Sequence, residues 1–198
     1  QSWWPATYKA IALGTTLAAF ALAVRMLFAF DKASSELHFV EDVTWVERFN
    51  IHYGFGIDGI AALMIFLTTL LGFIVVIGGW HYVKDREMGF FISLLLLQTG
   101  MTGVFCATDL FLFYVFWEAM LVPMYFIIGV WGGPRRVYAA IKFFLFTLVG
   151  SLLMLVAIVV VVWYVNDKGA GLTFDIRALS DVVYPYRLQF WAFAAFFL

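Results

Sequence analysis

Glu118 is the one charged side chain in a run of apolar and aromatic residues that extends from Phe111 to Val122. It lies eight positions beyond Leu110, where the apolar segment begins, which is about 12 Å along an α-helix at roughly 1.5 Å per residue. An ionised carboxylate at that depth in a bilayer costs considerable free energy unless it faces water or a partner charge. Glu118 is therefore predicted to be an acid of a proton relay, and the alternative is a protonated or paired structural glutamate.

Tyr114, Pro123 and Tyr125 belong to the same segment as Glu118. Pro123 has no N–H group, so the carbonyl of Ala119 loses its usual helical donor, and a kink with a free carbonyl beside an acid suits water. Tyr114 lies four residues before Glu118 and Tyr125 seven residues after it, which places the three side chains on one helical face. Each tyrosine is expected either to line a polar file or to pack against a neighbouring helix.

Lys142 lies six residues beyond Arg136 in the next apolar segment, about 9 Å inside that helix. One interpretation is that its ammonium group snorkels to the membrane surface. The other places it on the cytoplasmic branch of a proton path together with Thr147 and Ser151. Along straight helices Lys142 and Glu118 differ in depth by about 10 Å, which favours coupling through water over a contact ion pair.

The composition indicates that these residues lie in a membrane. Sixty-five per cent of the 198 residues are hydrophobic and 13% are charged, and the mean hydropathy is +0.97, far above the values of soluble globular domains. The aromatic content of 20% is typical of helices that face lipid and headgroups. The net charge of −1 argues against nucleic acid as a partner.

Five apolar segments approach or exceed the roughly 20 residues that a membrane-spanning helix needs. Unbroken runs in lipid are expected to be helical, because unpaired backbone groups are too costly there. The predicted spans are about Ala10–Phe30, Ile60–Trp80, Gly89–Ala107, Leu110–Trp131 and Val137–Val165, and a sixth begins near Leu188. The expected fold class is all-α, a polytopic transmembrane helix bundle in a single membrane domain over residues 1–198. Both ends are expected to be truncations of a longer chain.

The connection at residues 31–58 is predicted to carry a small β-hairpin on the outer surface, because Leu37–Tyr53 is rich in β-branched and aromatic residues. An irregular loop is the alternative. Lys and Arg residues are concentrated in the short connections on one side, which is therefore predicted to be cytoplasmic. These residues are Lys9, Lys84, Arg86, Arg135, Arg136 and Lys142. Arg25 lies near the far end of the first span and is expected to snorkel outward. A bacterial inner membrane is the expected location.

Two other patterns are interpreted as structural. Residues Gly54–Gly59 match G-x-G-x-x-G, but a membrane helix follows them and no βαβ unit surrounds them, so we expect a tight entry turn with Asp58 at a helix N-terminus. Cys106 is the only cysteine, which excludes a disulfide or cysteine cluster within this chain. No metal site is expected, because none of the three histidines has a second ligand at a suitable spacing.

Tyr114–Tyr125, Gly129–Gly133 and Arg136–Phe144 closely resemble the M-type antiporter-like subunits of complex I. Gly56–Gly59 resembles the family's entry to its third helix, and the likeness extends over residues 49–165. The resemblance implies an inverted-repeat helix bundle, of which this chain holds part, with Glu118 as a key charge of a proton half-channel and Lys142 at the start of the sixth helix. The family's central lysine would lie beyond Leu198, as would the second repeat.

The same resemblance implies an enzyme complex whose redox chemistry lies elsewhere. NADH, FMN, iron–sulfur clusters and quinone are expected in other subunits, with no cofactor in this chain. The expected partners are the lipid bilayer and the other membrane subunits of complex I, including neighbouring antiporter-like subunits. Two alternatives remain: a homologous subunit of a multisubunit Na⁺/H⁺ antiporter or membrane-bound hydrogenase, and a membrane scaffold without transport.

Overall fold

Five long helices form the body of the protein in the computed structural model, which describes residues 4–30 and 36–197. They are α1 (Trp4–Ala29), α2 (Gly59–Tyr82), α3 (Glu87–Cys106), α4 (Leu110–Trp131) and α5 (Arg136–Val165). All five are long and apolar enough to cross a membrane, and many of their large apolar side chains are exposed, as lipid-facing surfaces require. The predicted fold class, an all-α transmembrane bundle with a small hairpin, is confirmed.

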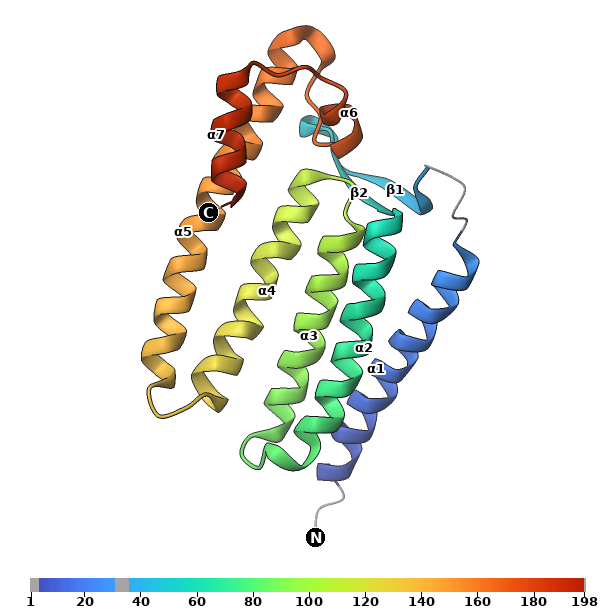
Figure 1. The fold of residues 1–198 in the computed structure, drawn as a ribbon, viewed down its shortest axis with the longest axis vertical. Helices are drawn as coiled ribbons and strands as arrows, with labels where there is room; N and C mark the ends of the chain where they lie inside the picture. The colour runs from blue at the N-terminus through green and yellow to red at the C-terminus, as the bar shows by residue number, and fades with distance from the viewer. Residues whose placement is uncertain (1–3, 31–35, 198) are drawn as a thin grey trace.

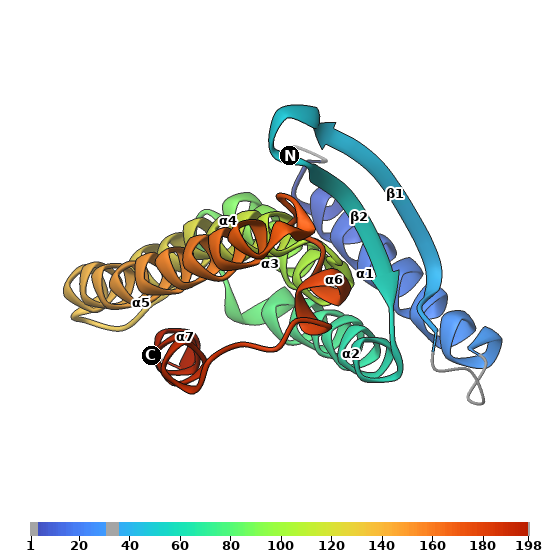
Figure 2. The ribbon, with the colours of Figure 1, turned by 90° about the horizontal axis from the view of Figure 1, so that it is seen from above.

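Consecutive helices are neighbours in the bundle, and α1 also contacts α3. The α2–α3 and α4–α5 turns lie at the same end as the start of α1, and we call this the loop end (Figure 1). The β-hairpin lies at the opposite end, which we call the hairpin end (Figure 1). Seen from above, the hairpin curves along the flank beside α1, away from α5 (Figure 2).

The hairpin consists of antiparallel strands β1 (His38–Val46) and β2 (Ile51–Ile57). A 3₁₀ turn, Glu47–Phe49, joins them, and Asn50 closes that turn in the left-handed conformation with φ 51°. The second strand extends past the predicted Tyr53. The hairpin is thus longer than β-branched and aromatic content alone indicated.

The expectation of a tight turn at Gly54 and Gly56 was wrong, because both glycines lie in β2. A Cβ on Gly54 would lie 2.6 Å from Oγ1 of Thr108, and one on Gly56 would lie 2.9 Å from Cγ2 of the same residue. Close approach of the α3–α4 turn therefore explains Gly54, and the same turn together with Leu37, whose Cδ1 would lie 2.8 Å from a Cβ, explains Gly56. Asp58 does cap α2 as expected, since its carboxylate accepts from the N–H of Ala61 at 2.7 Å.

The chain beyond α5 folds back onto the bundle. A π-helical turn (Asn166–Ala170) leads to α6 (Ile176–Ser180) and then to α7 (Tyr186–Phe197), which packs against α5 and is the segment whose start was predicted near Leu188. The α3–α4 turn is held between this return segment and β2. The N–H of Thr108 donates to the carbonyl of Gly54 at 3.1 Å, and the N–H of Leu110 donates to the carbonyl of Phe174 at 2.8 Å.

The loop end is held by a separate polar cluster. Lys9 Nζ lies 2.9 Å from Oε2 of Glu87 and donates to the carbonyl of Trp80 at 3.1 Å. The hydroxyl of Tyr8 donates to the same Glu87 oxygen at 2.5 Å. These contacts join α1, α2 and α3.

Gly103 of α3 lies directly against the ring of Phe116 in α4, and a Cβ at this position would overlap three ring atoms. Gly103→Ala is therefore expected to destabilise the packing of α3 on α4 by about 1–3 kcal/mol. Gly14→Ala is the matched control, because nothing lies within 4 Å of a Cβ there and alanine favours helix by up to about 1 kcal/mol. Thermal unfolding of the purified complex measures both; a Gly103→Ala midpoint equal to that of Gly14→Ala would show that Phe116 moves freely.

Candidate functional site around Glu118

Glu118 is half-buried in the middle of α4. Its Oε1 atom is fully buried and has no hydrogen-bond partner among the described residues. Buried polar atoms are nearly always paired with protein groups or water. An orphaned carboxylate oxygen here is therefore suited to water or to a group outside the described residues.

Tyr114 connects Glu118 to the neighbouring helix. Its hydroxyl lies close to the carboxylate of Glu118, one turn away, and to the hydroxyl of Ser151 on α5. Ser151 is 3% exposed, and its Oγ also lies 3.0 Å from the carbonyl of Leu148. The structure thus brings three of the predicted site residues together across the α4–α5 interface, with Ser151 beside Tyr114 and nine residues beyond Lys142.

A cavity of about 460 Å³ adjoins this cluster. Thr147 and Ser151 line it from α5, Trp117 lines it from α4, and Phe196 of α7 closes one side. The hydroxyl of Thr147 donates to the carbonyl of Phe143 at 2.7 Å. The polar groups that face this space are therefore few, but they belong to the same two residues that were predicted from the sequence.

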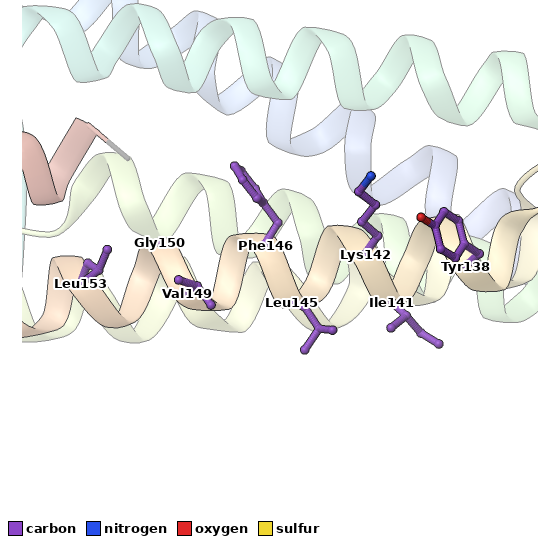
Figure 3. Close-up of a pocket in the computed structure, with 8 residues that line it drawn as sticks. All are labelled: Tyr138, Ile141, Lys142, Leu145, Phe146, Val149, Gly150 and Leu153. Carbon is purple, nitrogen blue, oxygen red and sulfur yellow. The ribbon is translucent and has the colours of Figure 1, made fainter.

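The structure shows no contact between Lys142 and Glu118. It is exposed on α5, and its ammonium group lies 5.9 Å from the centre of the Tyr138 ring. Figure 3 shows Lys142, Tyr138 and Phe146 projecting to one side of α5, whereas Ile141 and Leu145 project to the other. Lys142 lines open grooves along α5, outside the cavity that Thr147 and Ser151 line.

Pro123 and Tyr125 occupy the half of α4 nearer the loop end. Pro123 is buried, and α4 continues as one helix through it. Without an N–H at Pro123, the carbonyl of Ala119 lacks its regular donor. The ring of Tyr125 packs edge-on against Phe144 of α5, with centroids 5.7 Å apart. Tyr125 therefore occupies a packing position two turns from Glu118.

Asp109, which the sequence analysis did not single out, fixes the hairpin end of the helix that carries Glu118. It is 1% exposed. Its Oδ1 accepts from the N–H groups of Phe111 at 2.8 Å and Leu112 at 3.0 Å, and its Oδ2 accepts from the N–H of His52 in β2 at 3.1 Å. One carboxylate therefore caps α4 and ties it to the hairpin. An aspartate immediately before a long apolar run is the N-cap pattern that would have revealed it.

The electrostatics of Asp109 follow from its burial. Desolvation raises the pKa of this carboxyl above its ordinary value. The hydrogen bonds that it accepts from backbone N–H groups lower the pKa, but by less than desolvation raises it. The neighbouring His52 ring is held separately, with Nδ1 2.8 Å from Oδ1 of Asp42 and Nε2 3.1 Å from Oδ1 of Asn50. Within residues 4–30 and 36–197, no three His, Cys, Asp or Glu side chains are grouped to hold a metal ion.

Comparison with known proteins places this geometry in a family. The family model described as NADH:quinone oxidoreductase/Mrp antiporter, TM, matches residues 107–198. The NADH-quinone oxidoreductase subunit M of Rhodobacter capsulatus is 44% identical over 178 residues, which are 90% of this chain and 33% of that protein. The chain thus spans about a third of the length of this relative.

Solved structures agree in fold. A chain of respiratory complex I from Thermus thermophilus with bound NADH superposes with a TM-score of 0.75 at 26% identity, over 96% of this chain and 40% of that one. A chain of an archaeal membrane-bound sulfane sulfur reductase has a TM-score of 0.74 at 17% identity, over 95% of this chain and 37% of that one, and shows likeness of fold alone.

The fold thus defines a polytopic, antiporter-like membrane subunit. The sequence relatives identify the family within this class. The chain belongs to the family of M-type antiporter-like membrane subunits of NADH:quinone oxidoreductase.

Asp109→Ala is expected to destabilise the protein by about 1–3 kcal/mol, because it removes the cap of α4 and leaves the N–H of His52 unpaired. Asp109→Asn retains one acceptor oxygen for the cap and is expected to cost less. Thermal unfolding of the purified complex measures both. Asp58→Ala is the matched control, because its carboxylate caps α2 through Ala61 and forms no ion pair with a second element among the described residues.

The pH dependence of stability tests the effect of the charge of Asp109, because Asp109→Asn has nearly the same shape and does not titrate. Because its folded-state pKa is raised, the carboxyl stabilises the fold when protonated, and this contribution is lost as the pH rises through the folded-state pKa. The stability of native protein relative to Asp109→Asn is therefore expected to fall as the pH is raised from about 4 towards 7. A relative stability that rises over this range would contradict desolvation as the dominant effect.

Proposed function

We propose that this chain is part of a proton-translocating subunit of respiratory complex I, and that Glu118 is the central acid of its proton half-channel. The observation that carries the proposal is the buried Oε1 of Glu118, which has no hydrogen-bond partner among the described residues and lies in the middle of a helix long and apolar enough to cross a membrane. A carboxylate with a buried, unpartnered oxygen at that depth is costly to keep unless it exchanges protons. In the assembled complex, electron transfer from NADH to quinone drives that exchange.

The proton passes between α4 and α5 through Glu118, Tyr114 and Ser151. A phenol and a hydroxyl group both accept and donate hydrogen bonds, so they relay a proton without holding a charge. The contacts of Tyr114 with both neighbours support this order. The cavity beside Ser151 provides the space for water that completes the path on the side of Thr147.

Lys142 acts at the loop end of this path, which is the cytoplasmic side by the distribution of Lys and Arg. Its exposure means that it communicates with Thr147 through water and not by direct contact. Pro123 and Tyr125 support the path by shaping α4. Water bridges of this kind are common where polar groups lie more than about 3.5 Å apart.

The redox chemistry belongs to other subunits. NADH, FMN, the iron–sulfur clusters and quinone are bound there, and the single cysteine of this chain cannot ligate a cluster, which requires several thiolates. The partners of the chain are the neighbouring membrane subunits of the complex, in a bacterial inner membrane. The chain contributes to the enzyme as a translocase and carries no electrons.

The rival assignment is a homologous subunit of a multisubunit Na⁺/H⁺ antiporter or of a membrane-bound hydrogenase. Fold does not separate the two, because the sulfane sulfur reductase chain superposes nearly as well as the complex I chain. Sequence favours complex I, since the Rhodobacter capsulatus relative is 44% identical. The subunits that copurify with the full-length protein distinguish these assignments.

Glu118→Gln removes the exchangeable proton at nearly constant shape. Proton pumping by the assembled complex in vesicles, driven by NADH oxidation, is expected to fall about tenfold or more. Glu47→Gln is the matched control, because Glu47 is exposed in the hairpin turn and its loss should leave pumping unchanged. Equal proton-to-electron ratios and rates for Glu118→Gln and native complex would reduce Glu118 to a structural residue of a scaffold.

Lys142→Met tests the loop-end branch. Pumping is expected to fall by about twofold to fivefold, less than for Glu118→Gln, because the exposed ammonium group couples to the path only through water and does not carry the central step. Lys142→Arg should restore the native rate, since the positive charge is retained. Lys84→Met, an exposed lysine of the α2–α3 turn, is the control, and an identical loss in this variant would assign the effect to surface charge in general.

A further inference from the structure

A groove of about 900 Å³ lies beneath the β-hairpin, on the flank of the bundle away from α5. Its lining residues come mainly from α1, α3 and the hairpin, and α2 contributes Ile65 and Thr69. The hairpin lies at the end of these helices (Figures 1 and 2). The lining is dominated by apolar side chains, including Ala19, Leu22, Ile65 and Leu95. The Glu118 site is separate from it, because neither Glu118, Tyr114 nor Ser151 lines this groove.

Five threonines line the groove, yet their hydroxyl groups are already satisfied. Each hydroxyl donates to the carbonyl four residues earlier in its own helix, at 2.8 to 2.9 Å, in Thr15, Thr16, Thr69, Thr99 and Thr102. A hydroxyl that already donates to a carbonyl of its own helix does not need a hydrogen-bond acceptor from a ligand. Gln98 also lines the groove, and its buried Oε1 has no hydrogen-bond partner among the described residues. Apart from this one amide, the walls suit a hydrocarbon chain, and the threonines contribute methyl surface to it.

The mouth of the groove holds one cation and one anion. Arg25, near the hairpin end of α1, and Glu41 of β1 both line it and are both exposed. Neither side chain forms an ion pair or hydrogen bond in the described part of the chain. A guanidinium group binds a phosphate through two parallel hydrogen bonds, and a carboxylate binds a primary ammonium group. This pair of charges matches a zwitterionic headgroup, whereas a purely anionic headgroup would meet repulsion from Glu41.

The depth of the groove matches one leaflet. On α3 the lining extends from Cys106 at the hairpin end to Leu95, a rise of about 16 Å. Half of a hydrocarbon core is about 15 Å thick. Tyr53 and Phe39 of the hairpin lie at the mouth, where aromatic rings contact headgroups. A lipid whose phosphate meets Arg25 would therefore place its acyl chain along the walls.

We propose that this groove is a binding site for a phospholipid with a phosphate and a primary ammonium headgroup, of the phosphatidylethanolamine class, in the leaflet at the hairpin end. Arg25 binds the phosphate, Glu41 binds the ammonium group, and an acyl chain fills the space between α1 and α3. The site is independent of proton translocation, because it shares no residue with the Glu118 cluster. It also provides Arg25 with a partner at the membrane surface.

The test measures lipid retained by the assembled complex after purification in detergent. Mass spectrometry should find phosphatidylethanolamine bound to the native complex, and Arg25→Ala should reduce that amount about tenfold, the loss expected for a charge-assisted contact. Arg25→Lys should retain part of it. Glu41→Gln should lower the preference for phosphatidylethanolamine over phosphatidylglycerol, because the repulsion of an anionic headgroup is removed.

Arg48→Ala and Glu47→Gln are matched controls, since both residues are exposed at the hairpin end and lie outside the groove lining. Retained phosphatidylethanolamine should be unchanged in both. Equal retention in Arg25→Ala and native complex would overturn the proposal. So would density for the full complex in which polypeptide fills the space between α1 and α3. Pumping measured in parallel distinguishes this result from failure of the Glu118 assignment.

Discussion

The position of Glu118 depends on the carboxylate of Asp109. The acid lies nine residues along the helix that this carboxylate caps, and the second oxygen of Asp109 holds that helix to β2. On the other side of the same turn, the backbone of Thr108 and Leu110 bonds to the segment that follows α5. The α4 helix is therefore held from two sides, and its register relative to α5 places Tyr114 against Ser151.

The helices were predictable because lipid leaves an apolar chain few alternatives. Runs of about 20 apolar residues must satisfy their own backbone groups, and the five spans follow from that rule. The hairpin followed from β-branched and aromatic content, but the role of Gly54 and Gly56 did not. Both glycines are needed because Thr108, about fifty residues away in the sequence, lies against them, and Leu37 also lies against Gly56. No local sequence pattern predicts such an approach.

The candidate site, like the fold, was predictable from the sequence only in part. Glu118 and Tyr114 share a helix face, and helical periodicity was enough to associate them. The contact with Ser151 depends on the relative register of α4 and α5, which periodicity leaves open. Lys142 and Ser151 lie on one helix but line different spaces, since a separation of nine residues turns the side chain to another face. The prediction from the sequence grouped them by their depth along the helix alone.

Polar contacts between elements are concentrated at the two ends of the bundle. Lys9, Tyr8 and Glu87 join three helices at the loop end, and Asp109 with its neighbours joins four elements at the hairpin end. Among the described residues, the middle depends mainly on packing forces, with Tyr114 and Ser151 as a polar exception. These polar contacts fix the relative positions of the helices at both ends of the bundle, whereas apolar packing fixes most of the middle. A change in hydration around Glu118 would therefore alter side-chain packing before it broke any of the polar contacts at the two ends.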